Sequence, residues 1–100
     1  MITDKQFDDA FTAAGGWFIL SQYETLHNWK GTNVELAEIL FKEGFDSSIK
    51  GTKTRVACAL RIINEGRGEE ALLKIRNSDR INHQHPEAKK LAQYLLDKYY

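Results

Sequence analysis

The sequence predicts an all-α fold, a single compact domain over residues 1–100 built as a bundle of about five to six short helices. Three observations lead to this prediction. Apolar residues recur at helical spacing in almost every segment. N-cap residues and glycines separate the segments, and no stretch alternates for long enough to form a strand. The expected helices span residues 3–14, 17–29, 33–43, 53–65, 68–77 and 86–99.

The first two helices have clear boundary signals. Thr3 is placed as an N-cap with Gln6 three positions later, which is the pattern of a capping box. Ile2 and Phe7 occupy the positions of a hydrophobic staple, and the glycine pair at 15–16 ends the helix. The next segment, "WFILSQYETLHNW", has an apolar stripe, while Phe18 and Trp29 fall on other faces. The stripe consists of Ile19, Leu20, Tyr23, Leu26 and His27.

The middle of the chain contains the helix that we expect to be most buried. Thr32 with Glu35 forms a second capping box, and the apolar positions of 33–43 cover well over half of the helix surface. Residues 45–51, "FDSSIKG", are expected to form a loop. The helix at 53–65 turns Val56, Ala59, Leu60 and Ile63 toward the core and ends at Gly66.

The last part of the chain predicts two more helices. The segment 68–77 turns Ala71, Leu72 and Ile75 inward. Residues 78–85 are polar and are expected to form a connection with room for one short turn. Pro86 fits the first position of a final helix, whose inward stripe consists of Ala88, Leu91, Ala92, Leu95 and Tyr99.

Composition sets the class of protein. The chain is 42% hydrophobic and 28% charged, as a globular domain is. Its single cysteine, Cys58, excludes an intramolecular disulfide and indicates a reducing compartment. The first residues have acids where a signal peptide needs lysines, and the longest apolar run, "WFIL", is far too short to cross a bilayer. We therefore expect a cytoplasmic protein without membrane contact.

Charge is distributed unevenly although the formal net charge is zero. Residues 1–50 contain eight acids against four Lys/Arg, a net −4, and residues 51–100 contain ten Lys/Arg against six acids, a net +4. This asymmetry is compatible with an anionic partner for the second half. It is equally compatible with attraction between the two halves, or between two copies of the chain.

The basic excess gathers around the start of the 53–65 helix and predicts a nucleic-acid-binding surface. A helix N-terminus with cationic and hydroxyl side chains can hold phosphates. The cations do not form one stripe on the expected helix, and Arg61 can pair with Glu65. The linker to the preceding helix, eight or nine residues, is long for a helix-turn-helix. The predicted surface consists of Lys50, Thr52, Lys53, Thr54, Arg55, Arg61, Arg67 and Arg76.

The alternative function is a protein-interaction module, either a homodimer or an adaptor. Trp17, Phe18 and Trp29 cannot all join one stripe of the 17–29 helix. Either this helix is sandwiched between two layers, or some of these rings are exposed and form a binding patch.

No catalytic constellation is present, so we expect a protein that is not an enzyme and has no cofactor. His83 and His85 are two candidate ligands where a structural zinc site needs four. Cys58 is expected to fill space against a neighbouring helix. Adjacent acids such as Glu69 and Glu70 diverge on a helix and do not converge on one substrate atom. We therefore predict no metal site.

Overall fold

The structure is a computed structural model that describes residues 1–100. It confirms the all-α prediction, because the chain forms eight helices and no strand. None of the helices has the length and apolar character needed to span a membrane. The helices are α1 (Asp4–Ala14), α2 (Gly16–Ser21), α3 (Tyr23–Asn28), α4 (Asn33–Lys42), α5 (Ile49–Asn64), α6 (Gly68–Arg76), α7 (Asp79–Gln84) and α8 (Ala88–Tyr99).

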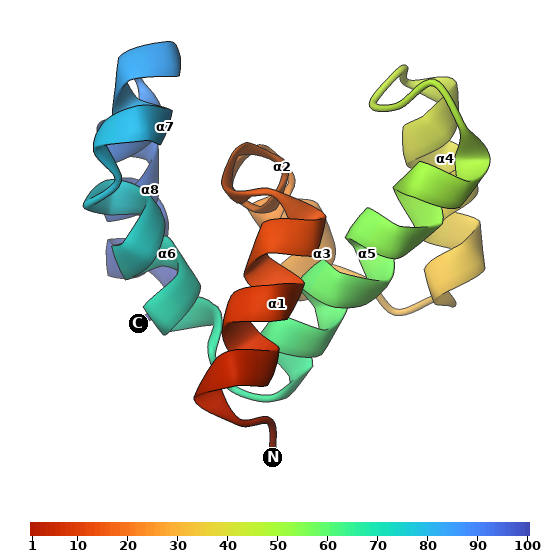
Figure 1. The fold of residues 1–100 in the computed structure, drawn as a ribbon, viewed down its shortest axis with the longest axis horizontal. Helices are drawn as coiled ribbons and strands as arrows, with labels where there is room; N and C mark the ends of the chain where they lie inside the picture. The colour runs from red at the N-terminus through yellow and green to blue at the C-terminus, as the bar shows by residue number, and fades with distance from the viewer.

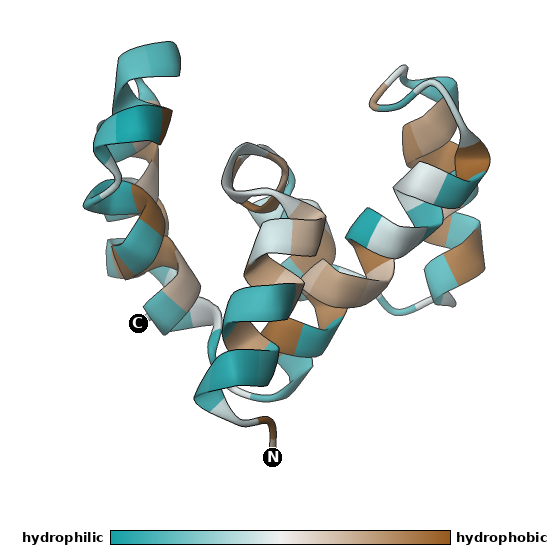
Figure 2. Cartoon of the chain, in the orientation of Figure 1, coloured by the Kyte–Doolittle hydropathy of each residue, from teal (hydrophilic) through white to brown (hydrophobic).

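The helices are arranged as an open V (Figure 1). One arm contains α4 and α5, the other contains α6, α7 and α8, and helices α1 to α3 lie between them. Figure 2 shows hydrophilic residues on the outward turns of α1 and α7. A continuous core of 24 buried apolar residues joins the arms.

Both predicted capping boxes are confirmed. The Thr3 side chain accepts a hydrogen bond from the backbone N–H of Gln6, and the Gln6 side chain accepts one from the backbone N–H of Thr3. Thr32 and Glu35 make the same reciprocal pair at the start of α4. Ile2 is buried, as its staple position predicts. These signals are local in the sequence and locate the helix starts well.

The predicted 17–29 helix is wrong as a single element, because it breaks at Gln22 into α2 and α3. A straight helix would turn only one stripe toward the core. The break gives the two short helices different inward faces, so each turns large apolar residues into the core. The residues buried in this way are Phe18, Ile19, Leu20, Tyr23 and Leu26.

The predicted 53–65 helix starts four residues too late. In the structure α5 begins at Ile49, because the Ser48 side chain accepts a hydrogen bond from the backbone N–H of Gly51 at 3.2 Å and caps the helix. The predicted loop at 45–51 is therefore wrong for its last three residues, and six residues connect α4 to α5.

Two differences concern the end of the chain. The polar connection at 78–85 forms α7, which Ser78 caps by accepting a hydrogen bond from the backbone N–H of Ile81. Asn82 then donates to the backbone carbonyl oxygens of Ile75, Arg76 and Ser78. The final helix begins at Ala88 and not at Pro86.

The central helix is α5, which corrects the expectation for residues 33–43. Helix α5 contacts α1, α3, α4 and α6, whereas α4 packs almost entirely on α5. Only Leu36, Ala37 and Leu40 of α4 are buried. Val34 and Ile39 are 48% and 46% exposed, because no further helix covers that side of α4.

Candidate nucleic-acid interface

The eight predicted nucleic-acid-binding residues do not form one surface. Six lie on α5, Arg67 precedes α6, and Arg76 ends α6. Four of the eight, Thr52, Arg55, Arg67 and Arg76, are buried or hydrogen-bonded within the fold, and the other four share one exposed side of α5.

Thr52 is fully buried and cannot contact a phosphate in this fold. Its hydroxyl group lies 3.3 Å from the carbonyl oxygen of Ser48 and 3.5 Å from the carboxylate of Asp46. Thr52 therefore supports the first turn of α5 from within, which corrects its prediction as a ligand-binding residue.

Arg55 joins three segments of the chain. Its Nε lies 2.9 Å from the Asp46 carboxylate, and its Nη1 donates to the carbonyl oxygen of Ala14 at 2.7 Å. The second bond satisfies a carbonyl at the C-terminus of α1 that has no intrahelical partner. Arg55 therefore positions α1 against the start of α5, and the prediction that it holds a phosphate on the outer surface is wrong.

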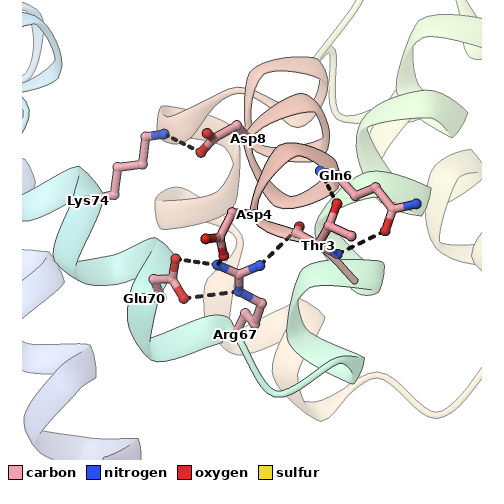
Figure 3. Close-up of polar contacts among 7 residues, drawn as sticks. All are labelled: Thr3, Asp4, Gln6, Asp8, Arg67, Glu70 and Lys74. Atoms are coloured by element: carbon pink, nitrogen blue, oxygen red, sulfur yellow. Dashed lines mark hydrogen bonds and ion pairs between the residues drawn. The ribbon is translucent and has the colours of Figure 1, made fainter. Parts of the chain in front are cut away.

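Arg67 lies between α1 and α6, at the centre of Figure 3. Its guanidinium group pairs with Glu70 at 2.6 Å and Asp4 at 3.0 Å, and donates to the carbonyl oxygen of Thr3. It also lies 4.2 Å from the centre of the Phe7 ring. The hydrogen bond with Glu70 raises the pKa of Arg67 above its usual range, and Asp4 adds to this effect. These partners leave no free cation here for nucleic acid.

Arg76 faces α8 and not α5. Its Nη1 donates to the side-chain oxygen of Gln93 at 2.7 Å. This position on the opposite arm of the V separates Arg76 from the cations of α5 (Figure 1).

The charge asymmetry is accounted for in part by pairing within the chain. Lys74 lies 3.1 Å from Asp8 (Figure 3) and 4.7 Å from the centre of the Phe11 ring. Lys98 lies 2.8 Å from Glu24. Together with Arg55–Asp46 and Arg67–Asp4, these pairs connect the acidic first half to the basic second half. Attraction between the halves is therefore one source of the asymmetry.

The residues that remain form a single stripe along α5. Lys50, Lys53 and Arg61 are exposed and have no carboxylate within ion-pair distance. Glu65, expected to pair with Arg61, pairs with the N-terminal amine at 3.4 Å. At about 100° per residue, the three cations share a side of the helix with Thr54 and Asn64, both exposed. The earlier start of α5 adds Lys50 to this face, which is why the stripe was not expected.

The aromatic residues of the alternative interface are largely packed inside the fold. Phe18 is only 4% exposed and meets Phe45 edge to face at 5.6 Å, so its assignment to an exposed patch is wrong. Trp17 is half-buried and stacks on His85 at 3.7 Å between ring centres. Trp29 is half-buried and donates its indole N–H to the carbonyl oxygen of Thr32. The sandwiched arrangement therefore accounts for Phe18.

The exposed large apolar residues lie elsewhere. Besides Met1 they are Val34, Ile39, Tyr94 and Tyr100. The sequence contained the signal for the first two, because the apolar positions of 33–43 are too many for one buried stripe. The expectation that this helix is fully buried required a covering helix, and the fold does not supply one.

The candidate catalytic and metal-binding residues do not come together in the fold. No three His, Cys, Asp or Glu side chains come together in a way that could hold a metal ion. The most perturbed group is Tyr23, whose pKa burial raises far above its usual range. Its hydroxyl forms a hydrogen bond with that of Tyr100, and the pair connects α3 to the C-terminus of the chain. This contact is structural in character.

Comparison of the chain with protein-family models, with curated proteins and with solved structures finds no match.

Proposed function

We propose that this protein binds nucleic acid, without catalysing a reaction, through the exposed stripe on α5. The stripe consists of Lys50, Lys53 and Arg61 with Thr54 and Asn64. One observation carries the proposal. Arg55, Arg67, Lys74 and Lys98 pair with acids, whereas these three cations are exposed together on one helix face and lack such partners.

The spacing of the stripe suits a phosphate backbone. Lys50 and Arg61 are eleven residues apart on α5, which corresponds to roughly 16 Å along the helix axis. One strand of a DNA duplex carries about five phosphates over that length, at 3.4 Å per phosphate. Three cations along this line can therefore each reach a phosphate, and the Asn64 amide can add hydrogen bonds.

This arrangement favours contacts with the backbone over reading of bases. The six-residue connection between α4 and α5 is longer than the three or four residues of a helix-turn-helix. Lysine contacts to phosphate carry no sequence information. We therefore propose weak, salt-sensitive binding with little sequence preference, in the cytoplasm that the sequence predicts.

The direct test measures binding of a fluorescein-labelled duplex and a labelled single strand at low salt, by fluorescence anisotropy. Lys53→Glu combined with Arg61→Glu should weaken binding by at least roughly tenfold, because two phosphate contacts become repulsive. Lys89→Glu combined with Lys90→Glu is the matched control, since both lysines are exposed on α8 and the change in net charge is the same. Absence of wild-type binding to either probe would overturn the function, and equal loss in both variants would overturn the surface.

A protein-interaction module is the second candidate. The observation in its favour is the exposure of Val34 and Ile39 on α4, since the fold covers neither. Sedimentation velocity at micromolar concentration separates the candidates. A homodimer that Val34→Asp dissociates, together with no affinity for nucleic acid, would favour the second.

A further inference from the structure

A cleft of about 540 Å³ lies between α7 and the turn that joins α1 to α2. Its volume falls within the range that small-molecule sites occupy. The two helices α2 and α7 lie near the open end of the V (Figure 1). None of the α5 stripe residues lines the cleft, so it is separate from the proposed nucleic-acid surface.

The walls of the cleft are aromatic and largely fixed in place. The apolar side chains that line it are Phe11, Trp17, Phe18, Phe45 and Ile81. Trp17 stacks on His85 with the two ring planes only 1° from parallel. Phe18 and Phe45 hold each other in an edge-to-face contact. Such packing leaves ring faces in position before a ligand arrives, which lowers the entropic cost of binding.

Both ionisable side chains that line the cleft are basic. Among its twelve lining residues the ionisable ones are Arg55 and Arg80, and no carboxylate is present. Asp46 and the carbonyl oxygen of Ala14 fix the Arg55 guanidinium through Nε and Nη1, and its Nη2 has no partner within the chain. Arg80 is exposed and makes no ion pair. One anchored and one free guanidinium group therefore lie beside an apolar surface.

The glycine pair lets side chains of other elements pack close to the backbone beside this cleft. A Cβ atom on Gly16 would collide with Cδ1 of Ile81, and one on Gly15 would lie 2.8 Å from Nη1 of Arg55. Gly15 also has a φ of +87°, a conformation that residues with a side chain rarely adopt. The backbone at this point is therefore placed directly between the apolar wall and the fixed arginine.

From this geometry we propose that the cleft is a binding site for a small organic anion with a flat apolar body, such as an aromatic carboxylate or an aromatic phosphate monoester. The ring lies against the half-buried Trp17. The acid group pairs with Arg80 and with the free Nη2 of Arg55, because guanidinium groups bind carboxylate and phosphate oxygens in a planar geometry.

The test uses a Trp29→Phe variant, in which Trp17 is the sole tryptophan, since the chain has two. The indole N–H signal of Trp17 in ¹⁵N-labelled protein is followed by NMR during titration. The probes are 2-naphthoate, 2-naphthyl phosphate, the neutral 2-naphthalenemethanol and inorganic phosphate. We expect saturable shifts with the first two, and binding at least roughly tenfold weaker for the neutral ring and for phosphate alone, because each lacks half of the contacts. The tighter of the two acids identifies the acid group that the cleft prefers.

Arg80→Gln should weaken 2-naphthoate and 2-naphthyl phosphate by roughly tenfold, the loss expected for one charge-assisted hydrogen bond. It should leave nucleic-acid binding unchanged. Arg61→Gln, on the outer face of α5, is the matched control and should leave both probes unchanged. No saturable shift with either acid, a neutral probe that binds as tightly as the acids, or an unchanged affinity in Arg80→Gln would overturn the proposal.

Discussion

Arg67 and Asp4 form an ion pair of 3.0 Å across 63 positions of the sequence. The same guanidinium group holds the carbonyl oxygen of Thr3, the residue that caps α1 (Figure 3). A local capping box and a long-range ion pair therefore meet at one helix start. The consequence reaches beyond stability, because pairing inside the chain removes Arg55, Arg67, Lys74 and Lys98 from the cations that a partner can contact.

Gly15 should tolerate substitution less well than another glycine with a similar φ. Gly44→Ala is expected to cost about 1–2 kcal/mol of unfolding free energy, since its φ is +88° but the space beside it is open. Gly15→Ala should cost more, because the new Cβ also displaces the Arg55 guanidinium from the end of α1. Urea unfolding of both variants measures the difference. Equal costs would show that the Arg55 contact contributes nothing.

Helix α4 should depend on one narrow face. Leu40 is 2% exposed and Ile39 is 46% exposed. Leu40→Ala is therefore expected to cost about 2–5 kcal/mol of unfolding free energy, and Ile39→Ala less than about 0.5 kcal/mol. Denaturant unfolding of both variants, fitted with one common dependence of the unfolding free energy on denaturant concentration, measures the two losses. A comparable loss in Ile39→Ala would mean that another surface covers α4.

Stability should fall in alkali because of Tyr23. Burial raises the pKa of its hydroxyl in the folded state, while the unfolded state ionises near the ordinary value of 10.0. The folded state then holds more protons, so unfolding becomes easier as the pH rises above 10.0. Tyr23→Phe should show a shallower alkaline fall in urea midpoint than the wild type. Parallel curves would contradict the assignment.

The ion pair of Glu24 and Lys98 should stabilise the folded state at neutral pH and lose this effect in acid. The hydrogen bond from Lys98 lowers the pKa of Glu24 below its ordinary value of 4.5. The contribution is therefore present above pH 4.5 and is lost as the pH falls through the lowered value. Lys98→Met should lower the thermal midpoint at neutral pH and converge with the wild type in acid. Lys90→Met, which removes an unpaired lysine of the same helix, should show no such convergence.

The fold could be predicted from the sequence wherever its signals are local. The capping residues Thr3 and Thr32 bond to groups three positions away, so their motifs are visible in the chain itself. The start of α5 was missed because Gly51 weakens helix propensity, and because Ser48, which caps the helix, lies inside the expected loop. The break at Gln22 was missed because the core selects it, and no breaking residue marks it.

The candidate site could be predicted only in part for a different reason. Charge composition located the basic region, but Arg55 and Arg67 find their acids 9 and 63 positions away. The pairing of Arg67 with Asp4 depends on how α1 packs beside α6. Helical periodicity does not specify that packing. The burial of α4 was overestimated for the same reason, since Val34 and Ile39 needed a neighbour that the topology does not provide.

The salt dependence of nucleic-acid binding tests the central proposal most directly. If the three cations of the α5 stripe each neutralise a phosphate, the logarithm of the association constant should fall against the logarithm of salt concentration with a slope of about −2.7, at 0.9 per phosphate. Lys53→Ala should make the slope less steep by about 0.9, whereas Lys74→Ala should leave it unchanged, because Lys74 already pairs with Asp8. A slope near zero in the wild type, or an equal change in both variants, would contradict the account.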